Sequence, residues 1–558
     1  MKSRIIGFIS CCLVAALGQA QETLPSDTFR VVKEYQPTLI DAEKIMFEPV
    51  IDDALKMDLD IKYSFIEKQV PVTFQVEPIP PAKIKGEPLI KLYNGYARLG
   101  VGNSLVPFGE VYYNNLRSKK YSIGGHASYL NMAEANEIKG SDMSQLHLEA
   151  FGKRFWKTNT LDASISYDLH TFNYYGYYNL KNPSNAAELN KADLEQNYNR
   201  LSATLKLKST KRDSFNLRHS GSLSYFLTTN RSNNAEGNVK GELNLNQFRN
   251  HELYNLDLVL DYNKYELNSD NTIFALKPQI STIGERFRIN AGLGIYMNAN
   301  RTADFHFYPI AEIKYNVIED VLVPYAGVKG EIRRVNYRSI TMENPFVAED
   351  IFLANANERY NAYLGLRGTF SSQLSFNVSG ALVKTENAHL YVQLPDTNRI
   401  LSKDFYLTYD ELDELRLKGE LVYRFNEKVK LYAETEYFDF ETKEEEKAWH
   451  RPNIKASAAV EYNLLSKLIA RLDLIYWGEQ YARNIDQIST VQNGLGVPAY
   501  KAKKLDPIFD ANLSVEYRYT KRLSAFVKAN NIGGINFEKY LNYPTQGFNI
   551  WGGLTYSF

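Results

Sequence analysis

The chain has 558 residues and a formal net charge of +0, which argues against a nucleic-acid-binding protein because such proteins carry a basic excess. Its mean hydropathy is -0.38, and no run of 18 or more apolar residues occurs, which excludes a helical membrane protein. A transmembrane β-barrel escapes this test, because its strands alternate lipid-facing with lumen-facing side chains. The 40 Tyr and 29 Phe residues suit such a barrel, since aromatic rings gather where a membrane meets water.

Residues 1–20 have the anatomy of a secretory signal peptide. Lys2 and Arg4 form a positive start, a short apolar stretch follows, and a small-x-small motif ends at Ala20. We therefore predict cleavage between Ala20 and Gln21.

Both cysteines, Cys11 and Cys12, fall inside this leader. The mature chain is then expected to have no disulfide, no thiol catalyst and no thiolate metal site. The alternative is a lipoprotein anchored at Cys11, although this would cut the apolar stretch short.

Residues 21–88 are rich in proline and differ from the rest of the chain. Residues 78–88 read as an extended linker, because proline cannot donate to a β-ladder and favours polyproline geometry. The segment is too small to bury much of a core alone. We predict a short periplasmic segment that docks onto a partner or into the barrel.

From residue 89 to residue 558 apolar and polar side chains alternate at period 2, in stripes long enough to cross a tilted bilayer path. Within 508–519, for example, Phe509, Leu513 and Tyr517 face one way. Asp510 faces the other way. We predict an all-β fold: a transmembrane antiparallel up-and-down β-barrel with a polar lumen.

The lumen-facing positions of this pattern carry charges of both signs, which predicts a wet, weakly selective wall. Two interpretations of the charges stay open: they are polar simply because the lumen is wet, which we favour, or some of them form ion pairs that brace the wall. The charged positions singled out are Arg416, Lys418, Glu420, Arg424, Asp510, Glu516 and Arg518.

Short and longer connections alternate along the chain, as in a barrel with tight periplasmic turns and longer outer loops. Ten short turns and eleven other connections join about 22 strands, so both barrel ends are expected on the periplasmic side. The count is open by two, because 390–394 and 405–409 are also compatible with a loop hairpin. The short turns are Arg117–Lys120, Lys157–Asn159, Lys211–Asp213, Asn250–Glu252, Gly284–Glu285, Ile318–Asp320, Ser371–Gln373, Asn426–Lys428, Leu464–Lys467 and Thr520–Arg522. The other connections are long at Met132–Asp142, Tyr178–Glu195, Tyr337–Ala354, Pro395–Lys403, Thr442–Arg451 and Ala482–Leu505, and short near Ser104, Arg231, Ser269, Arg301 and Gly534.

A soluble β-propeller or tandem sandwich is the alternative fold. A propeller predicts a shared motif every 40–50 residues or so, and the sequence shows only a shared periodicity. The stripes are also longer than ordinary soluble strands.

The C-terminus alternates apolar residues and ends on an aromatic strand, Tyr556-Ser557-Phe558. We predict that Tyr556 and Phe558 form the signal recognised by the barrel-assembly machinery, because the closing strand stays unpaired until the barrel shuts. The alternative is an ordinary closing strand.

The preceding residues resemble the last two strands of TonB-dependent receptors. An apolar strand, 523–532, runs into an Asn530-Asn531 turn, and a Tyr543-Pro544-Thr545-Gln546-Gly547 loop precedes the final strand. The resemblance implies a 22-stranded barrel. It departs at Phe548, where the family usually has arginine.

The first strand, Gly95-Tyr96-Ala97-Arg98-Leu99-Gly100, and the segment before it resemble a receptor-like barrel group common in Bacteroidota. Those receptors carry a plug domain of well over a hundred residues, whereas only 68 residues separate Gln21 from Leu89. Ligand gating and energy coupling are therefore not implied. A 22-stranded barrel is normally plugged, so we expect residues 21–88, inward-folded loops or a partner to fill it.

No motif supports catalysis, so we expect no enzyme and no cofactor. The eight histidines lack HExxH spacing or a neighbouring Ser/acid pair, and GxSxG and glycine-rich phosphate loops are absent. The acidic run 410–414 is a weak candidate for divalent cations, since it lacks EF-hand spacing, so we expect no metal site. The charged run 443–447 reads as a solvated loop tip.

Two functions stay open beside a disfavoured third, an outer-membrane enzyme. The first is a transport-type barrel of the outer membrane of a Gram-negative bacterium, in contact with lipid and lipopolysaccharide and occluded by its N-terminal segment, loops or a plug partner. The second is a structural or assembly subunit of an outer-membrane complex, with residues 21–88 as a docking arm.

Overall fold

The computed structural model describes residues 92–558 except 104–105, 117, 136–137, 180–193, 211–216, 269, 301–302, 319–320, 395–403 and 490–496. The predicted cleavage between Ala20 and Gln21 and the predicted periplasmic segment 21–88 lie outside the described residues and stay predictions.

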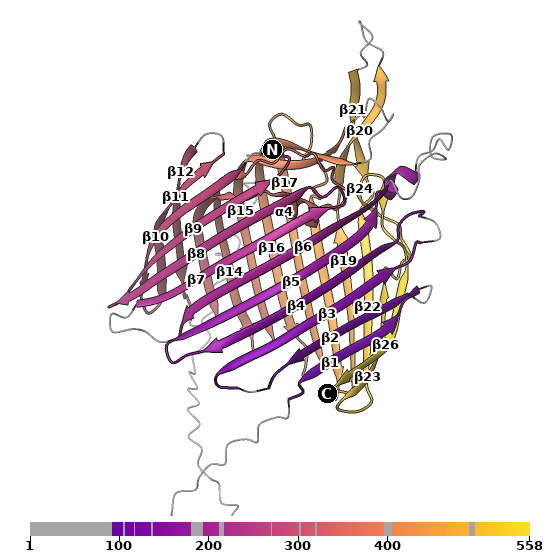
Figure 1. Ribbon diagram of the computed structural model, residues 1–558. Helices are drawn as coiled ribbons and strands as arrows, with labels where there is room; N and C mark the ends of the chain where they lie inside the picture. Colours follow the sequence, from indigo (N-terminus) through magenta and orange to yellow (C-terminus); the bar gives the residue numbers. More distant parts are fainter. Residues whose placement is uncertain are drawn as a thin grey trace, which may run out of the picture. The chain divides into compact units, whose positions relative to one another are not determined.

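Twenty-two antiparallel strands form one closed barrel (Figure 1), which confirms the predicted fold and strand number. Each strand pairs with its neighbours along the chain, β19 pairs with β22 across an intervening hairpin, and β1 pairs with β26 to close the ring. The first eleven strands are β1 (Gly95–Val101), β2 (Pro107–Asn114), β3 (Tyr121–Met132), β4 (Met143–Phe155), β5 (Asn159–Asn173), β6 (Glu195–Ser209), β7 (Leu217–Asn230), β8 (Ala235–Arg249), β9 (Glu252–Tyr265), β10 (Asn271–Ile283) and β11 (Phe287–Ala299). The other eleven are β12 (Ala303–Tyr315), β13 (Leu322–Arg333), β14 (Ala356–Ser371), β15 (Leu374–Gln393), β16 (Phe405–Arg424), β17 (Val429–Thr442), β18 (Ile454–Leu464), β19 (Leu468–Trp477), β22 (Ile508–Arg518), β23 (Leu523–Asn530) and β26 (Asn549–Ser557).

The remaining elements lie in the longer connections. They are the 3₁₀ helix η2 (Tyr175–Asn179), the α-helix α4 (Tyr337–Glu343), the hairpin of β20 (Gln480–Ser489) and β21 (Val497–Leu505), and the small pair β24 (Glu538–Tyr540) and β25 (Tyr543–Pro544). Among the residues described, no helix is both long and apolar enough to cross a membrane.

Nine of the ten predicted short turns lie, at least in part, within the described residues and join consecutive barrel strands at one end, which we call the short-turn end. The tenth, Lys211–Asp213, falls outside the described residues and stays a prediction. The strands that flank the other connections begin and end at the opposite, long-loop end. The suspected hairpin at 390–394 and 405–409 is instead the extension of β15 and β16, each 20 residues long, so the count stays at 22. The prediction of a short link near Gly534 was wrong. The β23–β26 connection spans residues 531–548 and holds β24 and β25.

The outer face of the barrel is apolar. Phe509, Leu513 and Tyr517 of β22 are exposed, as their alternation predicts, and equivalent positions are exposed around the ring. A soluble protein rarely exposes so continuous an apolar surface, so this face is suited to lipid. Other exposed apolar strand residues are Leu99, Ile123, Ile165, Leu223, Leu260, Phe305, Phe307, Leu364, Leu382 and Leu554.

Ion pairs brace the polar lumen wall. The Lys418 Nζ atom lies 2.8 Å from Glu420, 2.6 Å from Glu434 and 3.6 Å from Glu436, which ties β16 to β17. Arg416 pairs with Glu414 at 2.6 Å. The ion pairs that the sequence analysis gave as the less favoured interpretation are therefore present in this part of the wall.

Small residues allow the closing strands to approach each other. Gly100 of β1 faces Gly553 of β26, and a Cβ atom on Gly553 would lie 2.1 Å from the Leu99 carbonyl oxygen. Only glycine fits so close to another backbone. The backbone N–H groups of Asn94 and Gly95 donate to the Phe558 carbonyl oxygen, which completes the ladder at the short-turn end.

We predict that Gly553→Ala weakens closure of the barrel, at a cost of about 1–3 kcal/mol for overpacking. The measurement is the temperature at which the purified barrel loses its compact, fast-migrating form on a gel. Gly241→Ala in β8 is the matched control, because a Cβ there meets nothing within 4 Å. Equal melting of the two variants would contradict the account of the seam.

Candidate functional site: the loops that span the barrel mouth

The β13–β14 connection, residues 334–355, lies across the long-loop end of the barrel and includes α4 (Figure 1). Its residue Val347 forms a bridge with Phe405 of β16, while the Pro345 carbonyl oxygen accepts a hydrogen bond from Tyr198 of β6. Strands β6 and β16 are ten positions apart in a ring of 22, and so lie on nearly opposite walls. The connection, which we call the mouth loop, therefore spans the lumen.

An apolar core fixes the mouth loop. Tyr198, Tyr337 and Phe405 are completely buried in it. The rings of Phe346 and Tyr543 stack at 3.8 Å, so the β23–β26 connection joins the same core. The buried members are Phe172, Tyr198, Tyr265, Val335, Tyr337, Ile340, Val347, Ala348, Ile351, Ala356, Tyr391, Phe405, Ala482, Leu505, Tyr540, Leu541 and Tyr543.

Tyrosine hydroxyls hold the backbone of the mouth loop. A segment that leaves the sheet has unpaired carbonyl groups, and burial without a partner would cost about 1–3 kcal/mol for each. Five tyrosines from the wall and the neighbouring loops donate to these carbonyl oxygens. The bonds are Tyr174 to Val347 (2.8 Å), Tyr198 to Pro345 (2.8 Å), Tyr265 to Glu349 (2.6 Å), Tyr409 to Phe352 (2.8 Å) and Tyr540 to Glu343 (2.8 Å).

Charged groups fasten the start of the mouth loop to the wall. The Glu236 carboxylate of β8 accepts hydrogen bonds from the backbone N–H groups of Tyr337 and Arg338, both at 2.8 Å, where α4 begins. Arg334 pairs with Asp261 of β9 at 3.0 Å. Burial raises the pKa of Tyr337 to about 12, so its hydroxyl stays protonated.

Titratable side chains hold the C-terminal end of α4. Glu343 lies 3.3 Å from His389 of β15, and Arg451 donates to the His389 carbonyl oxygen at 3.1 Å. Burial raises the pKa of Glu343, but the hydrogen bond from His389 and the charges of His389 and Arg451 outweigh it and leave that pKa below its usual value. Burial lowers the pKa of the neighbouring His450 to about 4, so its ring is neutral.

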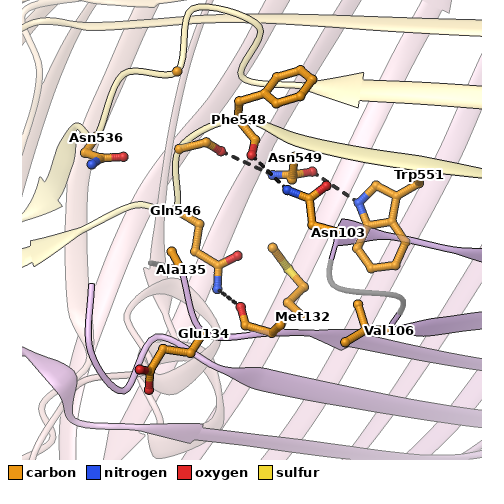
Figure 2. Close-up of a pocket in the computed structure, with 13 residues that line it drawn as sticks. Asn103, Val106, Met132, Glu134, Ala135, Asn536, Gln546, Phe548, Asn549 and Trp551 are labelled. Carbon is orange, nitrogen blue, oxygen red and sulfur yellow. Dashed lines mark hydrogen bonds between the residues drawn. The ribbon is translucent and has the colours of Figure 1, made fainter. Parts of the chain in front are cut away.

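A pocket of about 330 Å³ lies where the long-loop end meets the seam (Figure 2). Asn103 donates to the Phe548 carbonyl oxygen at 3.1 Å and accepts from the Ile550 N–H at 2.7 Å. Gln546 donates to the carbonyl oxygens of Ala133 and Ser141, at 3.1 and 2.6 Å. Figure 2 shows Asn103 directed toward the Phe548 backbone and Gln546 directed toward the β3–β4 connection. The hydrogen bonds of the lining tie three connections together. The lining side chains are almost entirely neutral, so the pocket supplies no acid–base pair.

Tyr556 and Phe558, the predicted assembly signal, lie at the short-turn end of the seam. Their rings stand 6.3 Å apart, and both side chains are about half exposed. Recognition by the assembly machinery stays a prediction.

Carboxylates of the acidic run 410–414 are paired with donors of the chain itself. The Asp410 carboxylate accepts the backbone N–H groups of Glu444 and Glu445, and Lys384 pairs with Glu411 and Asp413. The charged run 443–447 is not simply a solvated tip. Glu445 accepts from the Trp449 indole at 2.8 Å and from Arg483 at 3.3 Å.

Sequence reasoning left open what fills the barrel and did not identify the mouth loop. One usable signal was the apolar content of the connections, since Phe346, Val347 and Ile351 have no reason to lie in a solvated loop. The aromatic run 172–178 is a second such signal.

No protein-family model and no curated protein matches the sequence. Solved structures do match. The FrpB iron transporter from Neisseria meningitidis superposes with a TM-score of 0.63 at 9% identity, covering 84% of this chain and 82% of that chain. The pyoverdine outer membrane receptor FpvA from Pseudomonas aeruginosa gives 0.62 at 10% identity, covering 85% and 79%. The copper transporter OprC gives 0.61 at 10% identity, covering 83% and 80%.

These similarities establish the fold. The chain has the closed 22-stranded barrel of outer-membrane receptors and transporters, which confirms the resemblance to TonB-dependent receptors at the level of the barrel. The matched proteins are receptors and transporters rather than enzymes.

We predict that acid loosens the mouth loop. His450 is neutral when buried, with a pKa of about 4, and regains a value near 6.5 on release. The packed form therefore loses stability as pH falls from about 6.5 to 4, by on the order of 3 kcal/mol. Glu343 acts in the same direction, because the stability linked to its lowered pKa is lost as pH falls through that pKa.

The measurement is acrylamide quenching of Trp449, which is buried beside His450, in a variant with its other tryptophans replaced by Phe. Quenching should rise between pH 7 and pH 4.5. In His450→Asn the rise should be smaller; asparagine tolerates the left-handed backbone at this position (φ 59°). Quenching independent of pH in the parent would contradict the prediction.

Proposed function

We propose that this chain is a transport-type barrel of the outer membrane whose outer mouth is closed by its own loops. The observation that carries the proposal is the mouth loop, packed across a barrel of the size that receptors and transporters use. Barrels of 16–18 strands leave an aqueous channel, and one of 22 strands would leak large solutes unless something filled it.

In this proposal the long-loop end faces the exterior, and both ends of the barrel chain face the periplasm. The apolar outer face contacts lipid, and the outer rim contacts lipopolysaccharide. Tyr556 and Phe558 serve the barrel-assembly machinery during insertion. Residues 21–88 act from the periplasmic side, as a second occluding element or as the attachment point of a plug partner. The transported solute would be larger than those that pass ordinary porins.

A non-conducting scaffold is the second candidate. One observation favours it: among the described residues, 17 buried apolar side chains form the core that holds the mouth loop, which is more than a movable gate requires. In that case the barrel is a structural or assembly subunit of an outer-membrane complex, and residues 21–88 are its docking arm.

Conductance across planar bilayers separates closure by the loop from closure by the N-terminal segment. We expect low conductance for the full chain and for a variant lacking residues 21–88. Replacing residues 337–353 with a short Gly/Ser linker should raise conductance at least several-fold, because it removes the elements that bridge β6 and β16. Trimming residues 486–499 of the β20–β21 hairpin is the control and should change little. An unchanged conductance after loop replacement would contradict closure by the mouth loop.

Affinity purification from detergent-solubilised outer membranes tests the scaffold alternative. A stoichiometric partner that is lost on removal of residues 21–88, together with a loop replacement that supports no solute uptake, is the result expected of a scaffold. Solute uptake by the loop-replaced barrel supports transport.

A further inference from the structure

Two histidines and three carboxylates meet on the lumen wall a few residues below the mouth loop. Strands β2 to β5 supply them at neighbouring register positions: His126 faces Glu149, and His147 faces Asp168. Glu110 of β2 lies beside His126. Their strand neighbours of opposite parity, such as Ile123 and Ile165, face outward, so the cluster faces the lumen.

Three of these residues can share one ion. His126, His147 and Glu149 each place a ligand atom within 4.8 Å of the other two. Tetrahedral zinc, with bonds of about 2.0–2.2 Å, needs ligand atoms about 3.4 Å apart. Side-chain rotations that move the ligand atoms by roughly an ångström would bring them to this spacing, with no change in the backbone of the sheet.

Asp168 orients one of the ligands. The His147 Nδ1 atom lies 2.6 Å from the Asp168 carboxylate, which can only accept a hydrogen bond when ionised and so favours the tautomer with the proton on Nδ1. In that tautomer Nε2 is free to bind a metal, and it lies 4.0 Å from Glu149. Metal-bound histidines usually donate their second ring nitrogen to a carboxylate in this way, because the bond fixes the tautomer and the ring. An ion pair between two strands would not require the tautomer and the ring of the histidine to be fixed in this way.

His126 has an unsatisfied nitrogen. Its Nε2 atom is buried and makes no hydrogen bond, although a Glu110 oxygen lies 3.3 Å away. The ring is held flat against Tyr112, with centroids 3.9 Å apart and planes 2° apart. A buried polar atom without a partner is costly, and a bound cation or a proton shared with Glu110 would remove the cost.

The local charge favours a cation. Glu110 is neutralised by Arg98, 3.6 Å away, and Asp168 faces Arg200 across β5 and β6. Glu149 remains as the carboxylate that balances a divalent ion. Two imidazoles and one carboxylate form a ligand set suited to Zn²⁺, Co²⁺ or Ni²⁺ rather than to Ca²⁺ or Mg²⁺, which prefer all-oxygen sites.

We propose that His126, His147 and Glu149 bind one divalent transition-metal ion on the lumen wall, with Asp168 as the positioning residue. The fourth coordination position faces the lumen and is open to water or to a donor group of a passing solute. The proposal departs from the expectation, drawn from the sequence, that the chain has no metal site. It does not depend on transport, because a barrel that carries nothing would bind the ion equally well.

Titration of the purified full-length barrel with Co²⁺, followed by visible absorption and displacement by Zn²⁺, tests the site. We expect one ion per chain and a ligand-field band typical of four- or five-coordinate Co²⁺ with nitrogen ligands. His126→Gln, His147→Gln and Glu149→Gln should each weaken binding at least tenfold. Asp168→Asn should weaken it about 10–100-fold while leaving the ligand set, and so the band, in place.

His306→Gln is the matched control, since His306 faces the lumen from β12, outside the cluster, and should leave binding unchanged. Heat-dependent gel mobility shows whether each variant is folded, and if one histidine variant fails to fold, the other decides. Absence of saturable one-ion binding in the parent, or equal binding in the folded histidine variants, would overturn the site. Neither result bears on conductance, so the failure of this proposal and the failure of the proposed function are distinguishable.

Discussion

The structure depends on the need to pair every backbone N–H and C=O group where lipid offers no partner. A sheet meets this demand only by closing on itself. Closure brings β1 against β26, and the glycines at this seam let the two backbones approach. It also fixes the alternation of the other strands, since each must present one face to lipid and one to the lumen. The apolar outer face and the ion-paired inner wall are two consequences of the same constraint.

A ring of 22 strands creates a second demand, because its lumen is too wide for side chains of the wall to fill. The long connections meet it at one end. The mouth loop leaves the sheet between β13 and β14, so its carbonyl groups need new partners, and tyrosines provide them. Tyrosine suits this role because its ring adds to the apolar core while its hydroxyl satisfies the backbone. The high tyrosine content therefore serves the loops as well as the membrane interfaces.

The barrel could be predicted from the sequence more fully than the loops could. Alternation at period 2 is local and regular, so the outward set Phe509, Leu513 and Tyr517 and the short turns within the described residues could be recognised directly. The mouth loop depends on contacts between residues far apart in the chain, such as Tyr198 with Pro345, and no local pattern encodes them. The histidine cluster was missed for the same reason. His126, His147 and Asp168 have no motif spacing and meet only through the register of β3, β4 and β5.

The central claim is that the mouth loop crosses the lumen to the β6 wall. The most direct test replaces Tyr198 with the photoreactive residue benzoylphenylalanine and identifies the cross-linked peptide by mass spectrometry. The account predicts a cross-link to residues 337–353, because the side chain at position 198 ends against Pro345. The same probe at Tyr225, which faces outward from β7, should not reach that segment. Cross-links from position 198 that reach only neighbouring strands, and never the mouth loop, would contradict the account.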